Sequence, residues 1–202
     1  MITLHHVPRS RSVRVYWLLE ELGIPYEVKI ALGAPGAPKD PEYLKLNPLG
    51  KVPTIEDGDV VMFESGAIVE YLIEKYGNGR LAPAPGTPAR AKFLQWVHFG
   101  EATMAPPLAD IVVNTIFKPE AERLPAVVED GKRRLDLAIG VLDKELAGKE
   151  YLLGKEFGGA DIMVGYALFL TNLLGLASDK YANVAAYYAR LQQRPALQKA
   201  LG

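Results

Sequence analysis

The chain has 202 residues, of which 49% are hydrophobic and 23% charged, a composition that is ordinary for a soluble globular protein with a buried core. Lys and Arg total 23 and Asp and Glu total 24, so the net charge of −1 argues against a nucleic-acid partner and against binding to anionic membranes. There is no cysteine, which excludes disulfides, cysteine-ligated zinc and a cysteine nucleophile.

The N-terminus lacks the basic segment and long apolar run of a signal peptide. No apolar stretch approaches the ~20 residues that a membrane-spanning helix needs, so we expect a cytoplasmic protein with no membrane contact. His5, His6 and His98 do not combine with nearby carboxylates in a metal-ligand spacing, and we expect no metal.

The first part of the chain predicts a strand, a helix and a second strand. Residues 2–6 alternate apolar and polar side chains, as a strand does. Residues 13–22 indicate a helix that stops at Gly23 in a left-handed cap, and residues 26–30 indicate the next strand. This spacing suits a right-handed parallel crossover.

A loop, a hairpin and another helix follow. Residues 33–41 contain two Gly and three Pro and predict a loop, with a short helical turn at 42–46. Asp-Gly-Asp at 57–59 separates two apolar runs, which is a strong hairpin signal. Residues 66–76 predict a helix that stops at Gly77. The order implies an α/β domain with a four-stranded mixed sheet.

The remainder of the chain predicts helices only. Helical periodicity covers residues 89–117, 120–147, 161–176 and 181–193, and the pair Pro106-Pro107 should kink or break the first of these. We therefore expect α/β plus all-α architecture, with domains at 1–78 and 89–202 and a Gly- and Pro-rich linker at 79–88.

Pro53 stands directly before a predicted strand, where it cannot occupy the middle of a hydrogen-bonded ladder. A cis Val52–Pro53 bond would turn the Val52 amide and carbonyl outward, so that an extended peptide could pair with them. An ordinary trans proline at the start of the strand is the alternative.

Glu64 and Ser65 lie at a strand-to-helix junction. Ser65 can cap the helix, and that is its simplest role. The positive end of a helix also attracts a carboxylate while Glu64 attracts an ammonium, and a zwitterionic amino-acid head group needs both.

Ser10, Arg11 and Ser12 lie between the first strand and the first helix. Either serine can cap that helix, and the pattern favours Ser12 for this role. A hydroxyl at the positive end of a helix could also donate a hydrogen bond to a thiolate, which lowers the pKa of a thiol from its ordinary value of about 8.5.

Together these segments resemble the glutathione S-transferases, specifically over residues 2–77 and more loosely beyond. The resemblance is carried by Asn-Pro-Leu-Gly-Lys-Val-Pro at 47–53 and Glu-Ser-Gly-Ala-Ile at 64–68. The segment Ser-Arg-Ser-Val-Arg-Val-Tyr-Trp-Leu-Leu-Glu-Glu-Leu-Gly at 10–23 is similar to that of bacterial and fungal members of the serine type.

A helix-capping motif of the same family is similar to Phe-Gly-Gly-Ala-Asp at 157–161. Gly158 stands where the family usually has Ser or Thr. We expect a weaker cap, carried by Asp161 and a hydrophobic staple between Phe157 and Ile162.

The resemblance implies a thioredoxin-like N-terminal domain, a helical-bundle C-terminal domain and a homodimer. It implies an enzyme that takes glutathione as co-substrate and activates its thiol for attack on a small hydrophobic electrophile, or reduces an organic peroxide. A non-catalytic module that binds glutathione or apolar ligands, and a glutathione-dependent isomerase or dehalogenase, are the alternatives on the same fold.

The resemblance also implies roles for individual residues. Pro53 would be the cis-proline, Val52 would pair with the cysteinyl unit, and Glu64 and Ser65 would hold the γ-glutamyl group. A lysine would bind the glycyl carboxylate, and the candidates are Lys39 and Lys51.

Alignment on Arg14 implies that Ser10 stabilises the thiolate, with Arg11 and Ser12 as alternatives. Tyr16 is expected to pack inside its helix. The pocket for the electrophile would be formed between the domains by Val7, Pro8, Met104, Pro107, Leu108 and Ile111.

Overall fold

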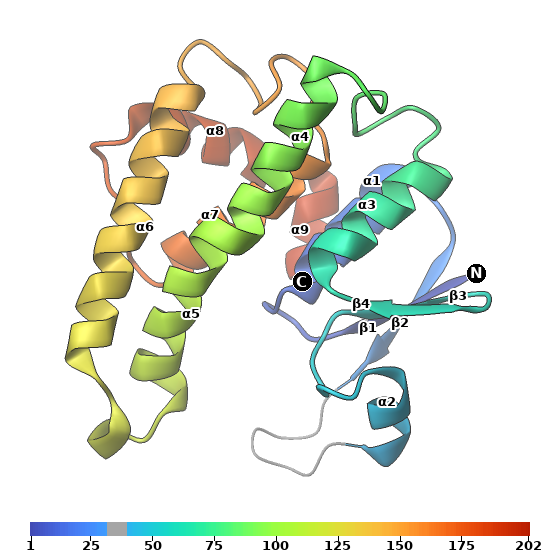
Figure 1. Ribbon diagram of the computed structural model, residues 1–202, viewed down its shortest axis with the longest axis horizontal. Coiled ribbons are helices and arrows are strands. Elements are labelled where there is room, and N and C mark those ends of the chain that lie inside the picture. Colours follow the sequence, from blue (N-terminus) through green and yellow to red (C-terminus); the bar gives the residue numbers. More distant parts are fainter. Residues whose placement is uncertain (32–39) are drawn as a thin grey trace. The chain divides into compact units, whose positions relative to one another are not determined.

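The computed structural model describes residues 1–31 and 40–202, and the first part of it is a four-stranded mixed sheet (Figure 1). β1 (Ile2–His6) pairs in parallel with β2 (Tyr26–Ile30) and antiparallel with β3 (Thr54–Asp57). β4 (Val60–Phe63) extends the sheet antiparallel to β3, which gives the strand order β2-β1-β3-β4. The predicted mixed sheet with one antiparallel hairpin is confirmed.

Helices cover both faces of this sheet. Figure 1 shows α1 (Ser12–Leu22) beside α3 (Ser65–Tyr76) on one face and α2 (Pro41–Leu46) on the other. α1 ends as predicted at Gly23, where φ is 68° and the backbone N–H donates to the carbonyl of Leu19. Apolar side chains fill the layer between the sheet and the helix pair, and the fully buried ones include Leu4, Leu18, Leu19, Ile55, Ile68, Val69 and Leu72.

One edge of the sheet gathers three chain segments. Thr54, the first residue of β3, lies opposite His5 near the end of β1 and opposite Phe63 at the end of β4. The turn that follows β1 and the junction that follows β4 therefore begin at this edge, and the segment that precedes β3 ends there, although the three are far apart in sequence.

The helical part follows most of the predicted spans. It contains α4 (Pro88–His98), α5 (Ala105–Val112), α6 (Pro125–Glu145), α7 (Gly159–Leu173) and α8 (Ala182–Gln192). π-helical turns at Phe99–Met104 and Val113–Phe117 flank α5, and a 3₁₀ turn spans Glu120–Glu122.

Pro106 and Pro107 occupy the first turn of α5. Proline has no N–H to donate to the preceding turn, and a π-helical segment ends directly before these residues. The predicted kink or break is therefore a change from π-helix to α-helix, and the helical segments remain continuous.

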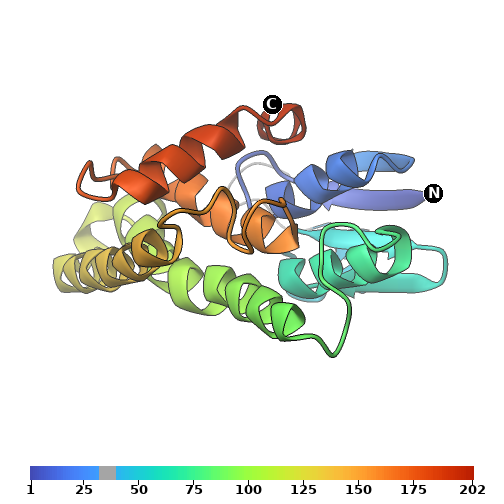
Figure 2. The same ribbon diagram turned by 90° about the horizontal axis from the view of Figure 1, so that it is seen from above.

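The chain divides into two compact units, Met1–Arg80 with Gln192–Gly202, and Leu81–Leu191. The sequence predicted residues 89–202 as one helical domain, whereas this division assigns the last segment to the first unit. That segment contains α9 (Pro195–Leu201), which the sequence did not predict and which packs on α1 (Figure 2).

Within the described residues, no helix has both the length and the apolar character needed to cross a bilayer.

The N-terminus of α7 has no hydroxyl cap. The Gly158 N–H donates to Asp161 Oδ2 at 2.8 Å, which is the half of the capping box assigned to Asp161. A Cβ at position 158 would lie 2.8 Å from the carbonyl oxygen of Leu81, so close packing explains the glycine. Phe157 packs edge-on against Tyr151, with ring centroids 5.6 Å apart.

Candidate functional site

The turn between β1 and α1 holds both predicted serines. The Ser10 hydroxyl donates to the carbonyl of Val7 at 2.8 Å and lies 2.7 Å from the Ser12 hydroxyl. The Ser12 N–H donates to Ser10 Oγ at 3.3 Å. Ser12 is fully buried whereas Ser10 is half-buried, so Ser10 carries the hydroxyl that a ligand at this turn can reach.

Ser12 is the first residue of α1, and the exposed Arg11 holds the N-cap position. The prediction that Ser12 caps the helix is therefore wrong. Its hydroxyl accepts the Val7 N–H at 3.1 Å and lies 2.8 Å from His6 Nδ1. Burial lowers the pKa of His6, so its imidazole is neutral at about pH 7.

The Val52–Pro53 peptide bond is cis, which is one of the two arrangements that the sequence allowed. Two buried side chains hold the carbonyl of Lys51, the residue before it. The Tyr43 hydroxyl donates to this oxygen at 2.5 Å and the Asn47 amide donates at 2.8 Å. Both also lie within hydrogen-bond distance of Thr54 Oγ1, so the segment is fixed at each end.

Glu64 is exposed and adopts φ 78° and ψ 102°, a conformation that non-glycine residues rarely take and that costs about 1–3 kcal/mol. α3 begins at Ser65, so Glu64 is the N-cap and the predicted capping role of Ser65 is wrong. The Ser65 hydroxyl instead accepts a hydrogen bond from Arg14 Nη1 at 3.0 Å. Arg14 is fully buried and places a positive charge beside this helix N-terminus.

The sheet edge thus brings together most of the predicted glutathione residues. Ser10 and Ser12 follow β1, Val52 and Pro53 precede β3, and Glu64 and Ser65 follow β4. The Arg14–Ser65 hydrogen bond links the first and third of these segments directly. Lys51 is exposed beside the second, and Lys39 lies outside the described residues.

The residues predicted for the electrophile pocket occupy different environments. In the first unit Val7 is half-buried and Pro8 exposed. In the second unit the side chains of Met104, Pro107, Leu108 and Ile111 are buried. A Cβ at Gly131 of α6 would lie 2.9 Å from Ile111 Cγ1, so α5 and α6 pack closely here. The role of these residues in substrate binding stays a prediction.

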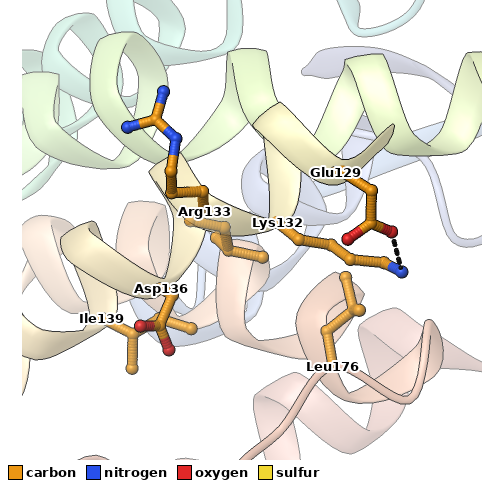
Figure 3. A pocket seen from close by; sticks show the side chains of 7 residues that line it. Glu129, Lys132, Arg133, Asp136, Ile139 and Leu176 are labelled. Carbon is orange, nitrogen blue, oxygen red and sulfur yellow. Dashed lines mark hydrogen bonds and ion pairs between the residues drawn. The ribbon is translucent and has the colours of Figure 1, made fainter. Parts of the chain in front are cut away.

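A hollow of about 400 Å³ lies in the second unit between α6 and Leu176, and the predicted pocket residues do not line it (Figure 3). Figure 3 shows Glu129 paired with Lys132, at 2.7 Å, among its side chains. Asp136 is paired with Lys180 at 2.6 Å. The charged groups of this hollow are thus engaged with neighbours in the same unit.

The sequence indicated no supporting role for four buried residues that hydrogen-bond to the site segments, which are His6, Arg14, Tyr43 and Asn47. Arg14 left a signal, because a charged residue stands among the apolar residues 13–19 of a helix. Among the described residues, no cluster of three or more His, Asp or Glu side chains is arranged to hold a metal ion.

Comparisons with known proteins identify the family of the chain. Residues 4–81 match the family description "Glutathione S-transferase, N-terminal domain", and residues 125–190 match "Glutathione S-transferase, C-terminal domain". Glutathione S-transferase 3 of Schizosaccharomyces pombe is 33% identical, over 97% of this chain and 85% of the relative. Glutathione S-transferase GstB of Escherichia coli strain K12 is 35% identical, over 98% of this chain and 97% of the relative.

Solved structures agree with the sequence matches. The theta class glutathione S-transferase from Xanthomonas axonopodis pv. citri, crystallised with glutathione bound, aligns with a TM-score of 0.83 at 33% identity. The alignment covers 99% of this chain and 96% of that one.

Proposed function

Because this chain belongs to the glutathione S-transferase family, we propose that it binds glutathione at the sheet edge described above and activates its thiol with Ser10. The observation that carries the proposal is the convergence of three segments at that edge, each with a group suited to one part of the tripeptide. These groups are the Ser10 hydroxyl, the Val52 backbone beside a cis proline, and the Glu64 carboxylate beside a helix N-terminus.

The γ-glutamyl group would bind at Glu64 and Ser65. The exposed Glu64 carboxylate suits its ammonium, and its unusual backbone conformation supports a role at a ligand site. Ser65 suits its carboxylate, because the buried Arg14 guanidinium can only donate to Ser65 Oγ. The Ser65 proton is then available for the ligand.

The cysteinyl unit would pair with the backbone of Val52, beside the cis Pro53. The buried contacts of Tyr43 and Asn47 with the Lys51 carbonyl support a fixed position for this segment. The glycyl carboxylate would lie within reach of the Lys51 side chain, with Lys39 as a second candidate.

Ser10 is favoured over its neighbours for the sulfur. Ser12 is fully buried and its hydroxyl has partners on several sides. Arg11 occupies the N-cap and carries no hydroxyl. A hydrogen bond from Ser10 stabilises the thiolate and so lowers the pKa of the thiol. The thiol proton passes to solvent, the sulfur forms a bond to the electrophilic carbon, and the leaving group departs with the electron pair.

The electrophile would be a small hydrophobic molecule, and Val7, Pro8, Met104, Pro107, Leu108 and Ile111 remain the residues proposed to contact it. We also propose a homodimer in the cytoplasm, as an implication of family membership. Peroxide reduction, isomerisation and dehalogenation would use the same thiolate, and a module that binds without turnover is the contrasting alternative.

The test is calorimetric titration of glutathione into wild type, Ser10→Ala and Ser65→Ala, with a conjugation assay on a generic aromatic electrophile. Ser65→Ala should lose binding. Ser10→Ala should retain binding and lose about 10²–10³ in rate. Ser178→Ala, on an exposed loop of the second unit, is the matched control and should match wild type.

Binding without turnover on any electrophile or peroxide would favour the non-catalytic module. Failure of wild type to bind glutathione would overturn the site assignment as a whole.

A further inference from the structure

We infer that His6 is a positioning residue that sets the direction of the hydrogen bonds around Ser10, so that the Ser10 hydroxyl can donate to the glutathione sulfur. The inference rests on the proposed role of Ser10 and adds to it. It is carried by the chain of contacts from His6 Nδ1 to Ser12 Oγ, at 2.8 Å, and from there to Ser10 Oγ, at 2.7 Å.

The first step concerns the hydroxyl of Ser12, which has one proton and accepts two hydrogen bonds. The Val7 N–H is always a donor, and it fills one of the two acceptor positions at 3.1 Å. The second position is contested by His6 Nδ1 and the Ser10 hydroxyl. Whichever of them donates, the other partner and the Val7 carbonyl, at 3.1 Å from Ser12 Oγ, are the acceptors left for the Ser12 proton.

Suppose that His6 carries its proton on Nδ1. The Nδ1–H then fills the second acceptor position of Ser12, and Ser12 must donate. Its possible acceptors are Ser10 Oγ at 2.7 Å and the Val7 carbonyl at 3.1 Å. The Val7 carbonyl already accepts the Ser10 N–H at 3.2 Å and the Ser10 hydroxyl at 2.8 Å, so the shorter contact with Ser10 Oγ is the favoured one. Ser10 Oγ also accepts the Ser12 backbone N–H at 3.3 Å, so both of its acceptor positions are filled.

In this state the Ser10 hydroxyl can act only as a donor. Without ligand its proton lies toward the Val7 carbonyl at 2.8 Å, and rotation about the Cβ–Oγ bond turns it to a bound sulfur. Hydrogen bonds accepted by an oxygen also polarise its own O–H, which strengthens the one that it donates.

Suppose instead that Nδ1 is bare. Ser12 then donates to His6, and Ser10 donates to the vacated position on Ser12. Ser12 Oγ, at 2.7 Å, then competes with a bound sulfur for the Ser10 proton, so the turn stabilises a thiolate less well. The Nδ1–H form therefore favours thiolate stabilisation, because it removes this competing acceptor.

The surroundings of His6 suit a fixed, neutral ring. The side chain is 4% exposed, burial lowers its pKa, and Tyr16 packs edge-on against it at a centroid distance of 5.3 Å. A neutral imidazole has one N–H, so the position of that proton distinguishes the two states.

The experiment measures the pKa of the glutathione thiol bound to the intact protein, from thiolate absorbance, together with kcat and KM. His6→Asn and His6→Leu form a matched pair of similar size. Asn places an amide near the position of Nδ1 and can donate to Ser12, whereas Leu cannot. Circular dichroism checks that each variant is folded.

His6→Leu and Ser12→Ala should raise the thiol pKa by about one unit, which is a roughly tenfold loss of thiolate at a fixed pH below the pKa. The KM for glutathione should stay within about twofold, because the γ-glutamyl contacts are unchanged. His6→Asn should restore most of the shift. His5→Leu is the control, since His5 faces the other side of β1 and bonds to Glu56, and it should not shift the thiol pKa.

A double-mutant comparison separates this inference from the proposed function. In a Ser10→Ala background, His6→Leu should cause no further shift. If Ser10→Ala leaves the thiol pKa unchanged, the role of Ser10 is wrong and the inference fails with it. If Ser10→Ala raises it but His6→Leu does not, the inference alone is overturned. Equal shifts in His6→Asn and His6→Leu would assign His6 a packing role and also overturn it.

Discussion

Asn47 shows how one buried side chain can organise a ligand-binding segment. It is 1% exposed, its amide donates to the Lys51 carbonyl and to Thr54 Oγ1, and its own oxygen accepts the Leu49 N–H at 3.1 Å. Every polar atom of the amide group is thus used to shape the turn before Val52.

Asn47→Ala should therefore lower the free energy of unfolding by about 1–3 kcal/mol, because it leaves buried polar groups of the turn without their partner. It should also raise the KM for glutathione by about tenfold, since the Val52 backbone is no longer held in place. Urea unfolding and steady-state kinetics measure the two effects.

Asn172→Ala is a suitable control. Asn172 is exposed and its amide bonds only locally, to the Leu168 carbonyl one turn earlier in α7. Its removal should change stability by less than about 0.5 kcal/mol and leave the KM unchanged. An Asn47→Ala protein with wild-type stability and KM would refute the organising role.

For individual residues, the sequence predicted which ones lie near the site better than it predicted their hydrogen-bond partners. Ser12 and Ser65 were both expected to cap helices, because serine before a helical segment does so locally. The Ser12 hydroxyl is instead hydrogen-bonded to His6 and Val7, and the Ser65 hydroxyl is hydrogen-bonded to Arg14. Those partners lie on other elements or other turns, and local propensity carries no information on them.

The junction of β3 and α3 contains a buried carboxylate. Asp57 is 7% exposed and accepts hydrogen bonds at 2.8 Å from Tyr71, Lys75 and Tyr76 of α3. Burial alone would raise the pKa of Asp57, but the hydrogen bonds from Lys75 and the two tyrosines bring it below its ordinary value.

A carboxyl group with a lowered pKa stabilises the folded state above its unfolded pKa. This contribution should be lost as pH falls below the ordinary value of 3.8 and through the lower folded value. Asp57→Asn should cost about 1.5–3 kcal/mol at about pH 7 and should remove this part of the acid dependence. Urea unfolding at neutral and acid pH provides the measurement, with the exposed Asp59→Asn as control.

The start of α7 offers a test of whether helix capping or close packing determines which residue type is tolerated at position 158. By analogy with the family, Gly158→Ser restores a hydroxyl cap and should stabilise the protein. The new Cβ would lie 2.8 Å from the Leu81 carbonyl oxygen, which is backbone and cannot easily move. We therefore expect Gly158→Ser to destabilise the protein by about 1–3 kcal/mol.

Gly140→Ala is the matched comparison. Its Cβ would meet the Tyr181 hydroxyl at 3.4 Å, an acceptable contact, and alanine favours the interior of α6. It should stabilise the protein by about 0.5–1 kcal/mol. The midpoint temperatures of thermal unfolding should shift in opposite directions from wild type in the two variants. A more stable Gly158→Ser protein would show that the backbone at Leu81 can adjust.

Among the elements, periodicity predicted the strands, α1 and α3 to within a residue or two. It had buried apolar residues to follow in β1, β3, α1 and α3, whereas β2 and β4 contain no buried residue. It was less successful around Ala105–Val112. Residues 89–117 have one continuous helical pattern, whereas the structure alternates α and π turns there. The apolar periods of these turns are too similar for a short sequence window to separate.

The C-terminal segment is the feature of the whole molecule that the sequence did not reveal. α9 is short and was not recognised as a helix, and its assignment to the first unit depends on contacts with residues far away in sequence. Arg194 Nε and Nη2 each donate to the Glu21 carboxylate at 2.7 Å, and Trp17 Nε1 donates to the same group at 2.9 Å. Polar contacts thus attach the end of the chain to α1.

Arg194→Ala should release this attachment and so destabilise the unit that we propose to bind glutathione, although Arg194 is not proposed to contact the ligand. The Glu21 side chain is 11% exposed, and we expect a loss of about 1–3 kcal/mol. Amide hydrogen exchange should accelerate over α9 and the facing part of α1 before it changes in the second unit. Lys199→Ala removes a neighbouring pair with Glu20 whose lysine is 58% exposed, and it should cost less than about 1 kcal/mol. If exchange in α9 is equally slow in both variants, apolar packing on α1 holds the segment and the ion pair contributes little.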